Sequence, residues 1–300
     1  MNNAKTAKQR RIFLLTALIA VVIFAVLLYA VFNPLKFYKL WNSGGKFDTT
    51  QDFVKFLDVG QGDCTLIYSN GFNAVIDLGE AYTANEVCMD LFDCEVKTID
   101  ALLISHLHSD HVGALPKIAE LFPIDSLIMP DVNSKSIISA QNGKSLAIKR
   151  GADFYKAKQG INFNIGEFEI TILAAFHDSN NENNRSPFIM AEIDDVKFLF
   201  TGDAERDAEK LLLKESLNLD CDVLKVSHHG SNTASSKEFL KATTPEYAVI
   251  SVSEDNSYHH PHKQTLNLLE TYEAEILRTD QSGDITFYVS NGEITVTKEK

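Results

Sequence analysis

The chain has 300 residues, of which 45% are hydrophobic and 23% are charged, so it is long enough to bury a substantial core. Its formal net charge of −13 argues against a broad electrostatic surface for nucleic acid, because phosphate binding is normally driven by Lys and Arg. This charge does not exclude a nuclease, since bound metal cations can supply positive charge locally. The four cysteines are too few and too scattered for a disulfide framework.

The N-terminal segment begins with a basic stretch and continues with a long apolar run. The stretch 1–11 carries four basic residues: Lys5, Lys8, Arg10 and Arg11. The run 12–32 has about 21 residues without a charge, which is the length needed to cross a bilayer. Positive charge before such a span keeps the N-terminus in the cytoplasm. The sequence therefore predicts a single-pass cell-membrane protein with an anchor at 12–32 and the rest of the chain outside the cytoplasm.

A cleaved signal peptide is the alternative interpretation of the same run. The apolar region of a signal peptide is shorter and ends in small residues at the cleavage site. This run is long and ends in Tyr-Ala-Val-Phe-Asn-Pro, so we expect an uncleaved anchor. An extracytoplasmic location would permit a disulfide between Cys88 and Cys94, but two free thiols on a helix face are the favoured expectation.

Beyond the anchor, residues 33–52 contain a proline, a glycine pair and scattered polar groups, which is typical of a juxtamembrane linker. From residue 53 on, apolar strand-like runs alternate with segments of helical spacing. In chain order we expect strands at 53–59, 64–69 and 72–79, a helix at 83–95 with Thr83 as its cap, a strand at 100–105, a helix at 114–123, strands at 125–130, 168–176, 186–193 and 196–203, a helix at 204–216, a strand at 221–230, a helix at 236–243, a strand at 247–252, a helix at 263–272, and strands at 275–280 and 284–290. This mixture predicts one α/β domain at 53–300, with two layers of sheet between helices.

Acidic and histidine residues recur where the predicted strands end, at Asp58, Asp77, His106, Asp203 and His228. The carboxyl ends of strands are where α/β folds bind ligands, and several such ends can converge on one site. These positions are therefore candidates for a shared site.

The stretch "HLHSDH" places four candidate metal ligands within six positions: His106, His108, Asp110 and His111. In a turn, the His-x-His pair can face one cation, and the adjacent Asp and His can turn toward a second. Imidazole together with carboxylate suits zinc, manganese or iron. A plain polar loop is the alternative, but four candidate ligands directly after an apolar strand favour a metal site.

Two further motifs offer partners for this cluster. Asp203 lies on a Gly turn after an apolar strand, a pattern that alone is more often plain turn chemistry. Together with the cluster it is a carboxylate that could bridge two cations. His228 and His229 lie in the same kind of position, before Gly230, which permits a sharp turn. One of these two histidines could instead be a helix cap or a surface residue.

These motifs resemble a known family. "HLHSDH", "TGD" and "SHHGS", in that order, look like the metallo-β-lactamase-like hydrolase superfamily. Further motifs are similar to the extracytoplasmic hydrolase domain of ComEC-type DNA-internalisation competence proteins: "FLDVGQGDCTLI" at 56–67, "VIDLG" at 75–79, "NENNRSPFIM" at 181–190, "VLKVSHHGSNT" at 223–233, "NSYHHPHKQTL" at 256–266 and "LRTDQSGDI" at 277–285. The resemblance covers about residues 53–290 and implies the four-layer αββα sandwich of the metallo-β-lactamase fold. It does not include the multi-span channel region of those proteins, so a role in DNA transport is not implied.

The resemblance also implies a centre with two divalent ions, zinc or manganese. The implied ligands are His106 and His108 on the first metal, Asp110, His111 and His228 on the second, and Asp203 between them. Asp77 would support the loop from behind, because a metal-bound imidazole needs an orienting acceptor on its other nitrogen.

One ligand that the superfamily usually has is missing from this chain. The third histidine of the first metal comes just before the strand predicted at 186–193, where this chain reads Asn183-Asn184-Arg185-Ser186. We expect Asn183 or a water to complete the first site. His177, six positions before Asn183, is the alternative.

His260 and His262 match the family's C-terminal His-Pro-His motif. Near an anionic substrate, histidine can donate a hydrogen bond or a proton to a leaving oxygen; a loop histidine that only braces the site is the alternative. The expected catalytic residues are Asp110, His260 and His262, and the expected supporting or substrate-contacting residues are Asp58, Asp77, Asn183 and His229. Within "DVGQGD", at 58–63, a structural turn that shapes the floor of the site is expected rather than catalysis.

Motifs and resemblance together predict a membrane-anchored, extracytoplasmic, binuclear metal-dependent hydrolase that acts on ester bonds. A hydroxide between the two cations would attack the electrophilic centre while the metals stabilise the developing oxyanion. By resemblance the substrate is a phosphodiester, so a nuclease acting on DNA or RNA is the first expectation. Such a substrate calls for a local basic surface, for which the candidate lysines are Lys225, Lys237, Lys241 and Lys263.

Two alternatives remain open. The same chemistry could act on cell-wall or phosphorylcholine-type phosphodiesters. An anchored binding protein with a vestigial metal site is an alternative of a different class, although the nearly complete ligand set counts against it. A β-lactamase activity is least expected, because "HHGS" and "HPH" belong to the phosphodiesterase-like side of the superfamily. No protein partner is predicted.

Overall fold

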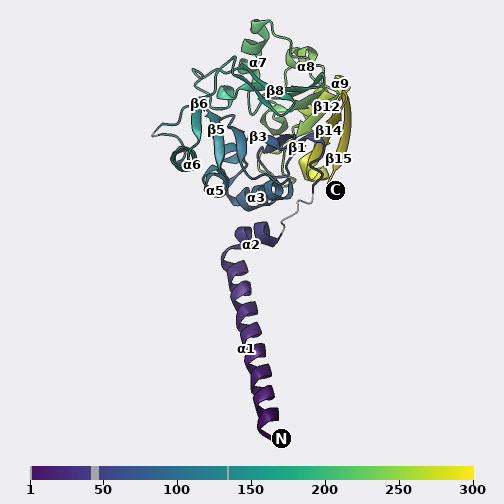
Figure 1. The fold of residues 1–300 in the computed structure, drawn as a ribbon. Coiled ribbons are helices and arrows are strands. Elements are labelled where there is room, and N and C mark those ends of the chain that lie inside the picture. Colours follow the sequence, from purple (N-terminus) through teal and green to yellow (C-terminus); the bar gives the residue numbers. More distant parts are fainter. Residues whose placement is uncertain (1, 42–46, 134) are drawn as a thin grey trace. The chain divides into compact units, whose positions relative to one another are not determined.

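The computed structural model describes residues 2–41, 47–133 and 135–300. The chain divides into two compact units, Met1–Gly45 and Lys46–Lys300 (Figure 1).

The first unit contains the helices α1 (Asn2–Phe32) and α2 (Pro34–Trp41). Within α1, the segment Leu14–Phe32 is long and apolar enough to span a membrane. Pro34 has no backbone N–H to continue the ladder of α1, but it suits the first position of a new helix. Helix α2 therefore begins inside the stretch 33–52 that was expected to be a linker. The glycine pair of that stretch lies outside the described residues.

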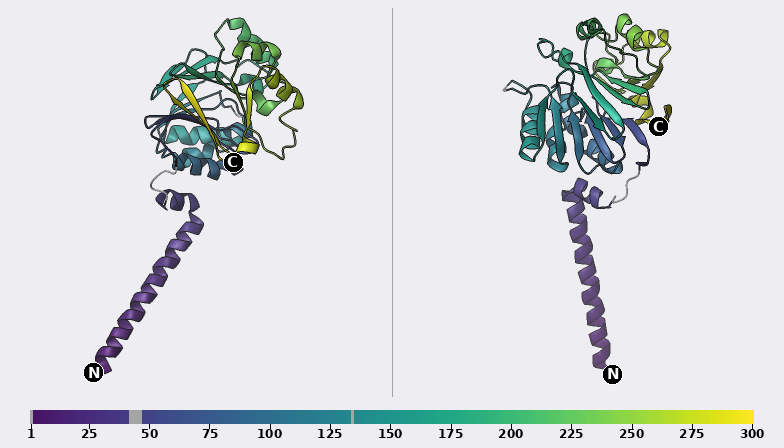
Figure 2. Two further views of the ribbon diagram at one scale, coloured as in Figure 1. Left: turned by 90° about the vertical axis from the view of Figure 1, so that its right-hand side faces the viewer. Right: turned by 45° about the horizontal axis from the view of Figure 1, so that its top comes forward.

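The second unit contains two mixed β-sheets that pack face to face (Figures 1 and 2). The first sheet has the order β15-β14-β1-β2-β3-β4-β5-β6, with β1 (Asp52–Phe56), β2 (Thr65–Ser69), β3 (Phe72–Ile76), β4 (Ile99–Leu103), β5 (Ile124–Met129), β6 (Asp153–Lys156), β14 (Ile285–Ser290) and β15 (Glu293–Lys298). The second has the order β13-β12-β11-β10-β9-β8-β7, with β7 (Asn162–Ile165), β8 (Phe168–Ala174), β9 (Phe188–Ile193), β10 (Val196–Phe200), β11 (Val223–Lys225), β12 (Tyr247–Ile250) and β13 (Glu275–Arg278).

Helices cover the outer face of each sheet, as Figures 1 and 2 show. The first sheet is covered by α3 (Ala84–Asp93), α5 (Leu115–Leu121) and α6 (Ile138–Lys149), and the second by α7 (Arg206–Leu212), α8 (Lys237–Thr243) and α9 (Lys263–Thr271). The shorter helical turns are α4 (Ser109–Val112), α10 (Thr279–Ser282), η1 (Ala81–Thr83), η2 (Asn183–Arg185), η3 (Leu213–Glu215) and η4 (Ser227–Gly230). The four-layer αββα sandwich expected from the sequence is therefore confirmed.

Alternation of side chains along the strands explains how both sides of a sheet are buried. In β10, Phe198 and Phe200 pack into the core between the two sheets, whereas Leu199 packs against the outer helices. Successive residues of a strand point to opposite faces, so a strand covered on both faces needs a continuous apolar run. The sheets thus form a rigid frame from which the loops project.

Each sheet contains a parallel section, and the loops of interest follow it. Strands β3, β4, β5 and β6 run parallel in the first sheet, and β10, β11, β12 and β13 run parallel in the second. Asp77, His106, Asp203 and His228 come after the carboxyl ends of β3, β4, β10 and β11. This is the edge at which α/β sheets bind ligands.

The four cysteines are free and buried: Cys64, Cys88, Cys94 and Cys221. Cys88 and Cys94 form no disulfide, so the favoured expectation of two free thiols is confirmed.

Candidate metal centre

A cavity of about 370 Å³ lies where the loops after the parallel strands meet. Its lining residues are Gln61, His108, Ser109, Asp110, Ile137, Asn183, Asp203, His228, His229, Tyr258 and His260. Most of them belong to motifs recognised in the sequence. Ile137 and Tyr258 do not stand out in the sequence as site residues, because an isolated apolar or aromatic residue in a loop has no distinguishing pattern.

The first group of metal-type side chains in this region is His106, His108 and Asp203. Their candidate ligand atoms all lie within 4.8 Å of one another. His106 Nε2 lies 3.0 Å from His108 Nδ1 and 3.7 Å from Asp203 Oδ2. His106 and Asp203 are buried, whereas His108 is exposed, so the group opens to the cavity on the side of His108.

The second group is Asp110, His111, Asp203 and His229, again within 4.8 Å of one another. Asp110 Oδ2 lies 3.3 Å from His229 Nε2 and 3.8 Å from His111 Nε2. Asp203 Oδ1 lies 3.3 Å from His111 Nε2 and 3.6 Å from His229 Nε2.

Asp203 belongs to both groups and turns a different oxygen toward each. Its Oδ2 faces His106, and its Oδ1 faces His111 and His229. A carboxylate in this orientation has the geometry of a bridging ligand between two cations. The sequence could indicate Asp203 as a partner of the cluster, but only the fold shows its position between the two groups.

The donor set of the second group fits a divalent cation. Among the residues that the structure describes, none forms a hydrogen bond with the buried atoms His111 Nε2, Asp203 Oδ1 and His229 Nε2. Buried polar atoms without a partner are rare in proteins and call for an explanation such as an ion. Imidazole nitrogen and carboxylate oxygen are ligand types that zinc and manganese accept.

Asp77 orients one histidine of each group. Its carboxylate accepts hydrogen bonds from His111 Nδ1 (2.8 Å), from the Ser105 hydroxyl (2.7 Å) and from the Ser105 backbone N–H (2.7 Å). The Ser105 oxygen in turn accepts from His106 Nδ1 at 3.1 Å. Because both Nδ1 atoms are occupied, the Nε2 atoms of His106 and His111 face the region between the groups. The carboxylate of Asp77 therefore lies behind the loop, on the far side of His111 and Ser105 from the cavity-facing Nε2 atoms.

His229 is oriented by a second buried set of partners. Its Nδ1 donates to the Ser251 carbonyl (2.9 Å) and lies 3.4 Å from Asp63 Oδ1. Asp63 Oδ2 pairs with Lys225 Nζ at 2.9 Å, and both side chains are almost completely buried. The expectation that Lys225 offers a basic surface to substrate is therefore wrong, because it is the internal counter-ion of Asp63.

Charges within the site stabilise one another against the cost of burial. Burial alone would raise the pKa of Asp203, but His111 and His229 outweigh it and hold that pKa well below its usual value. Burial also opposes ionisation of Asp110, yet the nearby imidazoles of His229 (3.3 Å) and His111 (3.8 Å) lower its pKa to about 2. Burial disfavours protonation of His229, but Asp203 and Asp63 raise its pKa to about 10 in the metal-free site, so a cation held by Nε2 would take the place of that proton. The carboxylates therefore stay ionised at neutral pH and present negative charge to a cation.

His228 lies elsewhere than the resemblance implied. Its Nε2 lies 3.7 Å from Asp203 Oδ2, the oxygen that faces the first group, and its Nδ1 lies 3.3 Å from Glu205 Oε1. His229, rather than His228, stands with the second group. Both histidines have φ = 52°, an uncommon left-handed conformation that occurs at functional sites. Two successive left-handed residues turn the adjacent rings in different directions, which sequence motifs alone do not reveal.

Asn183 lines the same cavity as His108 and Asp203. Its Nδ2 is 3.5 Å from His228 Nε2 and 3.2 Å from Glu205 Oε1. Its Oδ1 is buried and has no hydrogen-bond partner within the described ranges. His177, the alternative, instead forms a hydrogen bond with the Ala157 carbonyl and does not line the cavity.

His260 lines the cavity, with its ring centroid 5.5 Å from that of His228. Its Nδ1 is buried and has no hydrogen-bond partner in the described part of the chain. Burial, reinforced by His229 and His228, lowers the pKa of His260 to about 4, so its imidazole is neutral at pH 7.

His262 and Asp58 serve the turns around the cavity rather than lining it. His262 Nδ1 accepts a hydrogen bond from the Asn232 backbone N–H (3.0 Å), which braces the loop after His229. The Asp58 carboxylate accepts from Gly60 N–H (3.3 Å) and pairs with Lys300 Nζ (3.1 Å). These contacts correspond to the bracing role considered for His262 and the structural turn expected around Asp58.

A comparison with known families decides the membership of this chain. The model described as "Metallo-beta-lactamase superfamily" matches residues 57–254, a range that includes both groups of metal-type side chains. The chain belongs to the metallo-beta-lactamase superfamily. Its αββα sandwich is the metallo-beta-lactamase fold, and the resemblance recognised in the motifs is confirmed.

Three curated relatives and one solved structure extend this result. ComE operon protein 3 of Bacillus subtilis is 30% identical over 200 residues, which cover 65% of this chain and 25% of the relative. Competence protein ComA of Neisseria gonorrhoeae is 29% identical over 241 residues, covering 80% of this chain and 32% of the relative. Endoribonuclease ysh1 of Schizosaccharomyces pombe is 33% identical over 76 residues, covering 23% of this chain and 10% of the relative. The metallo-beta-lactamase fold protein YhfI of Bacillus subtilis shares the fold, with a TM-score of 0.53 at 13% identity over 82% of this chain and 99% of YhfI.

The chain spans about a quarter to a third of the length of the competence relatives it matches. Within this chain, the region that matches the metallo-beta-lactamase family, 57–254, contains the two groups around Asp203.

Proposed function

We propose that this protein is a membrane-anchored, extracytoplasmic phosphodiesterase that binds two divalent cations, zinc or manganese, and cleaves nucleic acid. The observation that carries the proposal is Asp203, whose two oxygens face two separate groups of histidine and aspartate side chains. The names of a competence protein and an endoribonuclease among its relatives favour a nucleic-acid phosphodiester over other esters.

The two cations, when bound, supply a nucleophilic hydroxide at neutral pH and neutralise charge that develops on the phosphoryl oxygens. The residues that would hold them are His106 and His108 on one side, Asp110, His111 and His229 on the other, and Asp203 on both. Asp77 keeps the Nε2 atoms of His106 and His111 aimed at this region through Ser105 and through its own bond to His111.

His260 has a separate role in the proposal. It lines the cavity and carries a buried Nδ1 that no described residue binds. A neutral histidine has one N–H to donate, so His260 can form a hydrogen bond with a phosphoryl or leaving oxygen. His262 supports it indirectly by holding the loop at Asn232.

In this proposal the membrane anchor is the apolar segment Leu14–Phe32. Basic residues precede it, and positive charge is retained on the cytoplasmic side of a membrane. The domain that follows would then act outside the cytoplasm.

A metal-dependent activity panel tests the proposed function. The full chain in neutral detergent, freed of metal and then supplied with manganese or zinc, should cleave single-stranded DNA or RNA as well as bis-p-nitrophenyl phosphate. We expect His108→Ala to abolish this cleavage and His177→Ala, a histidine outside the cavity, to retain it. Cleavage of phosphorylcholine esters with none of nucleic acid would refute the nucleic-acid assignment, and the absence of any phosphodiester cleavage would refute the proposed function.

Tyr258 provides a test of whether bases as well as phosphates are bound. It lines the cavity, is 63% exposed, and its ring stacks on that of His260 with centroids 5.6 Å apart. An exposed aromatic ring can stack on a base, which contributes about 1–3 kcal/mol per base. Tyr258→Ala should therefore raise the KM for an oligonucleotide by about 5- to 150-fold. Tyr258→Phe should not raise it.

An oligonucleotide that lacks bases is the matched substrate for this variant. Tyr258→Ala should leave the KM for the abasic strand unchanged, because no base is present to stack. An equal loss on both strands would contradict the stacking role.

A further inference from the structure

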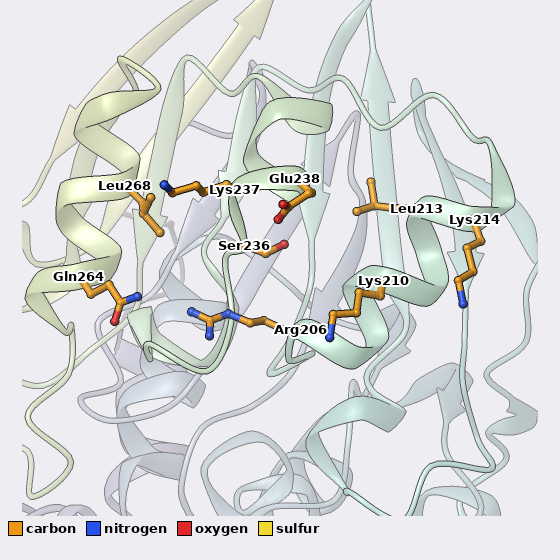
Figure 3. Close-up of a pocket in the computed structure, with 9 residues that line it drawn as sticks. All are labelled: Arg206, Lys210, Leu213, Lys214, Ser236, Lys237, Glu238, Gln264 and Leu268. Carbon is orange, nitrogen blue, oxygen red and sulfur yellow. The ribbon is translucent and has the colours of Figure 1, made fainter.

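A second cavity, of about 560 Å³, lies on the helical side of the second sheet (Figure 3). Its lining residues are Arg206, Lys210, Leu213, Lys214, Ser236, Lys237, Glu238, Gln264 and Leu268. Four of them are basic and one is acidic, in a chain with a net charge of −13. The lining of this cavity is therefore positively charged, although the chain as a whole has a negative net charge. We call this cavity the basic groove.

The basic side chains of the groove come from two sides. Arg206, Lys210 and Lys214 follow one another at four-residue intervals along α7 and η3, and Lys237 comes from the start of α8 (Figure 3). Residues four apart share a helix face, and the rise of about 1.5 Å per residue separates Arg206 from Lys210 by about 6 Å along the axis. The result is a row of cations rather than a single point charge.

Part of this charge has acidic neighbours, because the charge of Arg206 acts on the buried Glu209 and Glu238 lines the groove itself. Among the residues that the structure describes, Lys210 is the one member of the four with an ion pair, to Asp207 at 3.2 Å. That pair is solvent-exposed, with side-chain exposures of 67% and 82%, so its contribution to stability is small and a phosphate can replace it.

A buried carboxylate holds the two sides of the groove together. Glu209 of α7 is completely buried and accepts hydrogen bonds from the Ser235 N–H (2.6 Å) and the Ser236 N–H (2.9 Å) at the start of α8. This link fixes Arg206 and Lys210 relative to Lys237. The spacing of the cations is therefore built into the fold.

The basic groove adjoins the candidate metal centre, because residues that line the groove are close in the chain to residues that contact His228. Arg206 directly follows Glu205, whose Oε1 lies 3.3 Å from His228 Nδ1. Ser236 comes three residues after Thr233, whose hydroxyl lies 3.2 Å from the same nitrogen. The two segments are joined by a hydrogen bond from Arg206 N–H to the Thr233 carbonyl at 3.1 Å. Three residues span at most about 10 Å, so a strand a few nucleotides long can reach from one site to the other.

We propose that the basic groove binds backbone phosphates of the nucleic-acid strand that is cleaved at the metal centre. The proposal rests on the proposed function and adds to it a polyanionic substrate that extends beyond the scissile bond. A row of cations suits a chain of phosphates, because each contact releases counterions and the contributions accumulate along the strand.

Binding of labelled single-stranded DNA to the metal-free full chain in neutral detergent tests the proposal without any cleavage. The test variant is Lys210→Gln/Lys214→Gln/Lys237→Gln, and the charge-matched control is Lys97→Gln/Lys149→Gln/Lys158→Gln, three exposed lysines outside the groove. For a strand of about 20 nucleotides, the affinity of the test variant should be about 10-fold or more lower. The slope of the logarithm of its binding constant against the logarithm of the salt concentration should become shallower by about 2. The control should retain the affinity and slope of the unmodified protein.

Cleavage of short and long substrates separates this proposal from the proposed function. Bis-p-nitrophenyl phosphate is too small to reach the groove, so the test variant should hydrolyse it at the unmodified rate while its KM for the long strand rises about 10-fold or more. Equal DNA affinity of the test variant and the unmodified protein would overturn the groove proposal and leave the proposed function intact. Unchanged DNA binding together with lost binding to phosphatidylglycerol vesicles would also overturn it, by assigning the groove to a membrane surface.

Discussion

Replacing Asp203 by asparagine should abolish phosphodiester hydrolysis and weaken cation binding at both metal groups. Asp203 is the side chain that belongs to both, with Oδ2 toward His106 and Oδ1 toward His111 and His229. Replacement of even an outer partner of a metal ligand typically costs 10- to 100-fold in affinity, so loss of a shared ligand should cost more than about 100-fold. Isothermal titration of the metal-free chain with manganese measures this loss.

The control for this variant is Asp195→Asn, a change of the same kind in the turn between β9 and β10. It should bind cations and cleave substrate as the unmodified protein does. Circular dichroism of both variants checks that the fold is retained. Tight binding of two cations by Asp203→Asn would contradict the bridging role of this carboxylate.

Replacing Lys225 by methionine should destabilise the domain by about 3 to 5 kcal/mol, which is the typical result of leaving a buried charge without its partner. Lys225 Nζ lies 2.9 Å from Asp63 Oδ2, and both side chains are almost completely buried. Chemical denaturation of the metal-free chain measures the free energy of unfolding. The double variant Lys225→Met/Asp63→Asn should recover part of the loss, because it removes the uncompensated charge.

The loss of unfolding free energy in Lys225→Met should become smaller as the pH falls. Burial raises the pKa of Asp63, but Lys225 and His229 outweigh it and hold that pKa below its usual value in the folded protein. In the unmodified protein, stability from this carboxylate is therefore present above about pH 4 and lost as the pH falls through the depressed folded pKa. Without Lys225 only His229 and His111 oppose the effect of burial, so the folded pKa of Asp63 rises and the variant loses less stability as the pH falls. The difference between the two proteins should shrink from about pH 7 to about pH 4.

Lys156→Met is the matched control for this measurement. Lys156 pairs with Asp131 at 2.6 Å, but the two side chains are 33% and 62% exposed. Exposed pairs contribute about 0 to 1 kcal/mol, so little change in stability is expected. A similar loss in Lys156→Met and Lys225→Met would contradict the assignment of Lys225 as a buried counter-ion.

Much of the frame of this domain could be predicted from periodicity. Strands such as β9 and β10, which are buried on both faces, read as continuous apolar runs and were expected near their actual positions. The helix α6 and the strands β6, β7 and β15 were not expected. Strands β6, β7 and β15 alternate, but apart from Ile165 their inward side chains are only half-buried, and only three residues of α6 are buried, so these elements bury few apolar side chains. The three strands form because neighbouring strands supply hydrogen-bond partners.

The chemistry of the site was visible in the sequence wherever ligands are adjacent along the chain. The HLHSDH motif indicated a metal site because four candidate ligands lie within one turn. The relation between His228 and His229 was not visible, since it depends on two successive left-handed residues that direct neighbouring rings to different groups. A motif identifies which residue types are present, whereas backbone torsions decide where each side chain points.

Residues that act through others were the hardest to predict. Asp63 was expected to be part of a turn, and Lys225 to face substrate, yet together they form a buried pair beside His229. Ser105, between His106 and Asp77, was not expected to take part at all. Such residues have no motif of their own, because their role comes from contacts between segments that are distant in the sequence.

The most direct test of the central claim is an anomalous-difference map from manganese-loaded crystals of the protein. Two peaks should flank Asp203, one beside His106 and His108 and the other beside Asp110, His111 and His229. A single peak, or peaks away from Asp203, would contradict a binuclear centre bridged by this carboxylate.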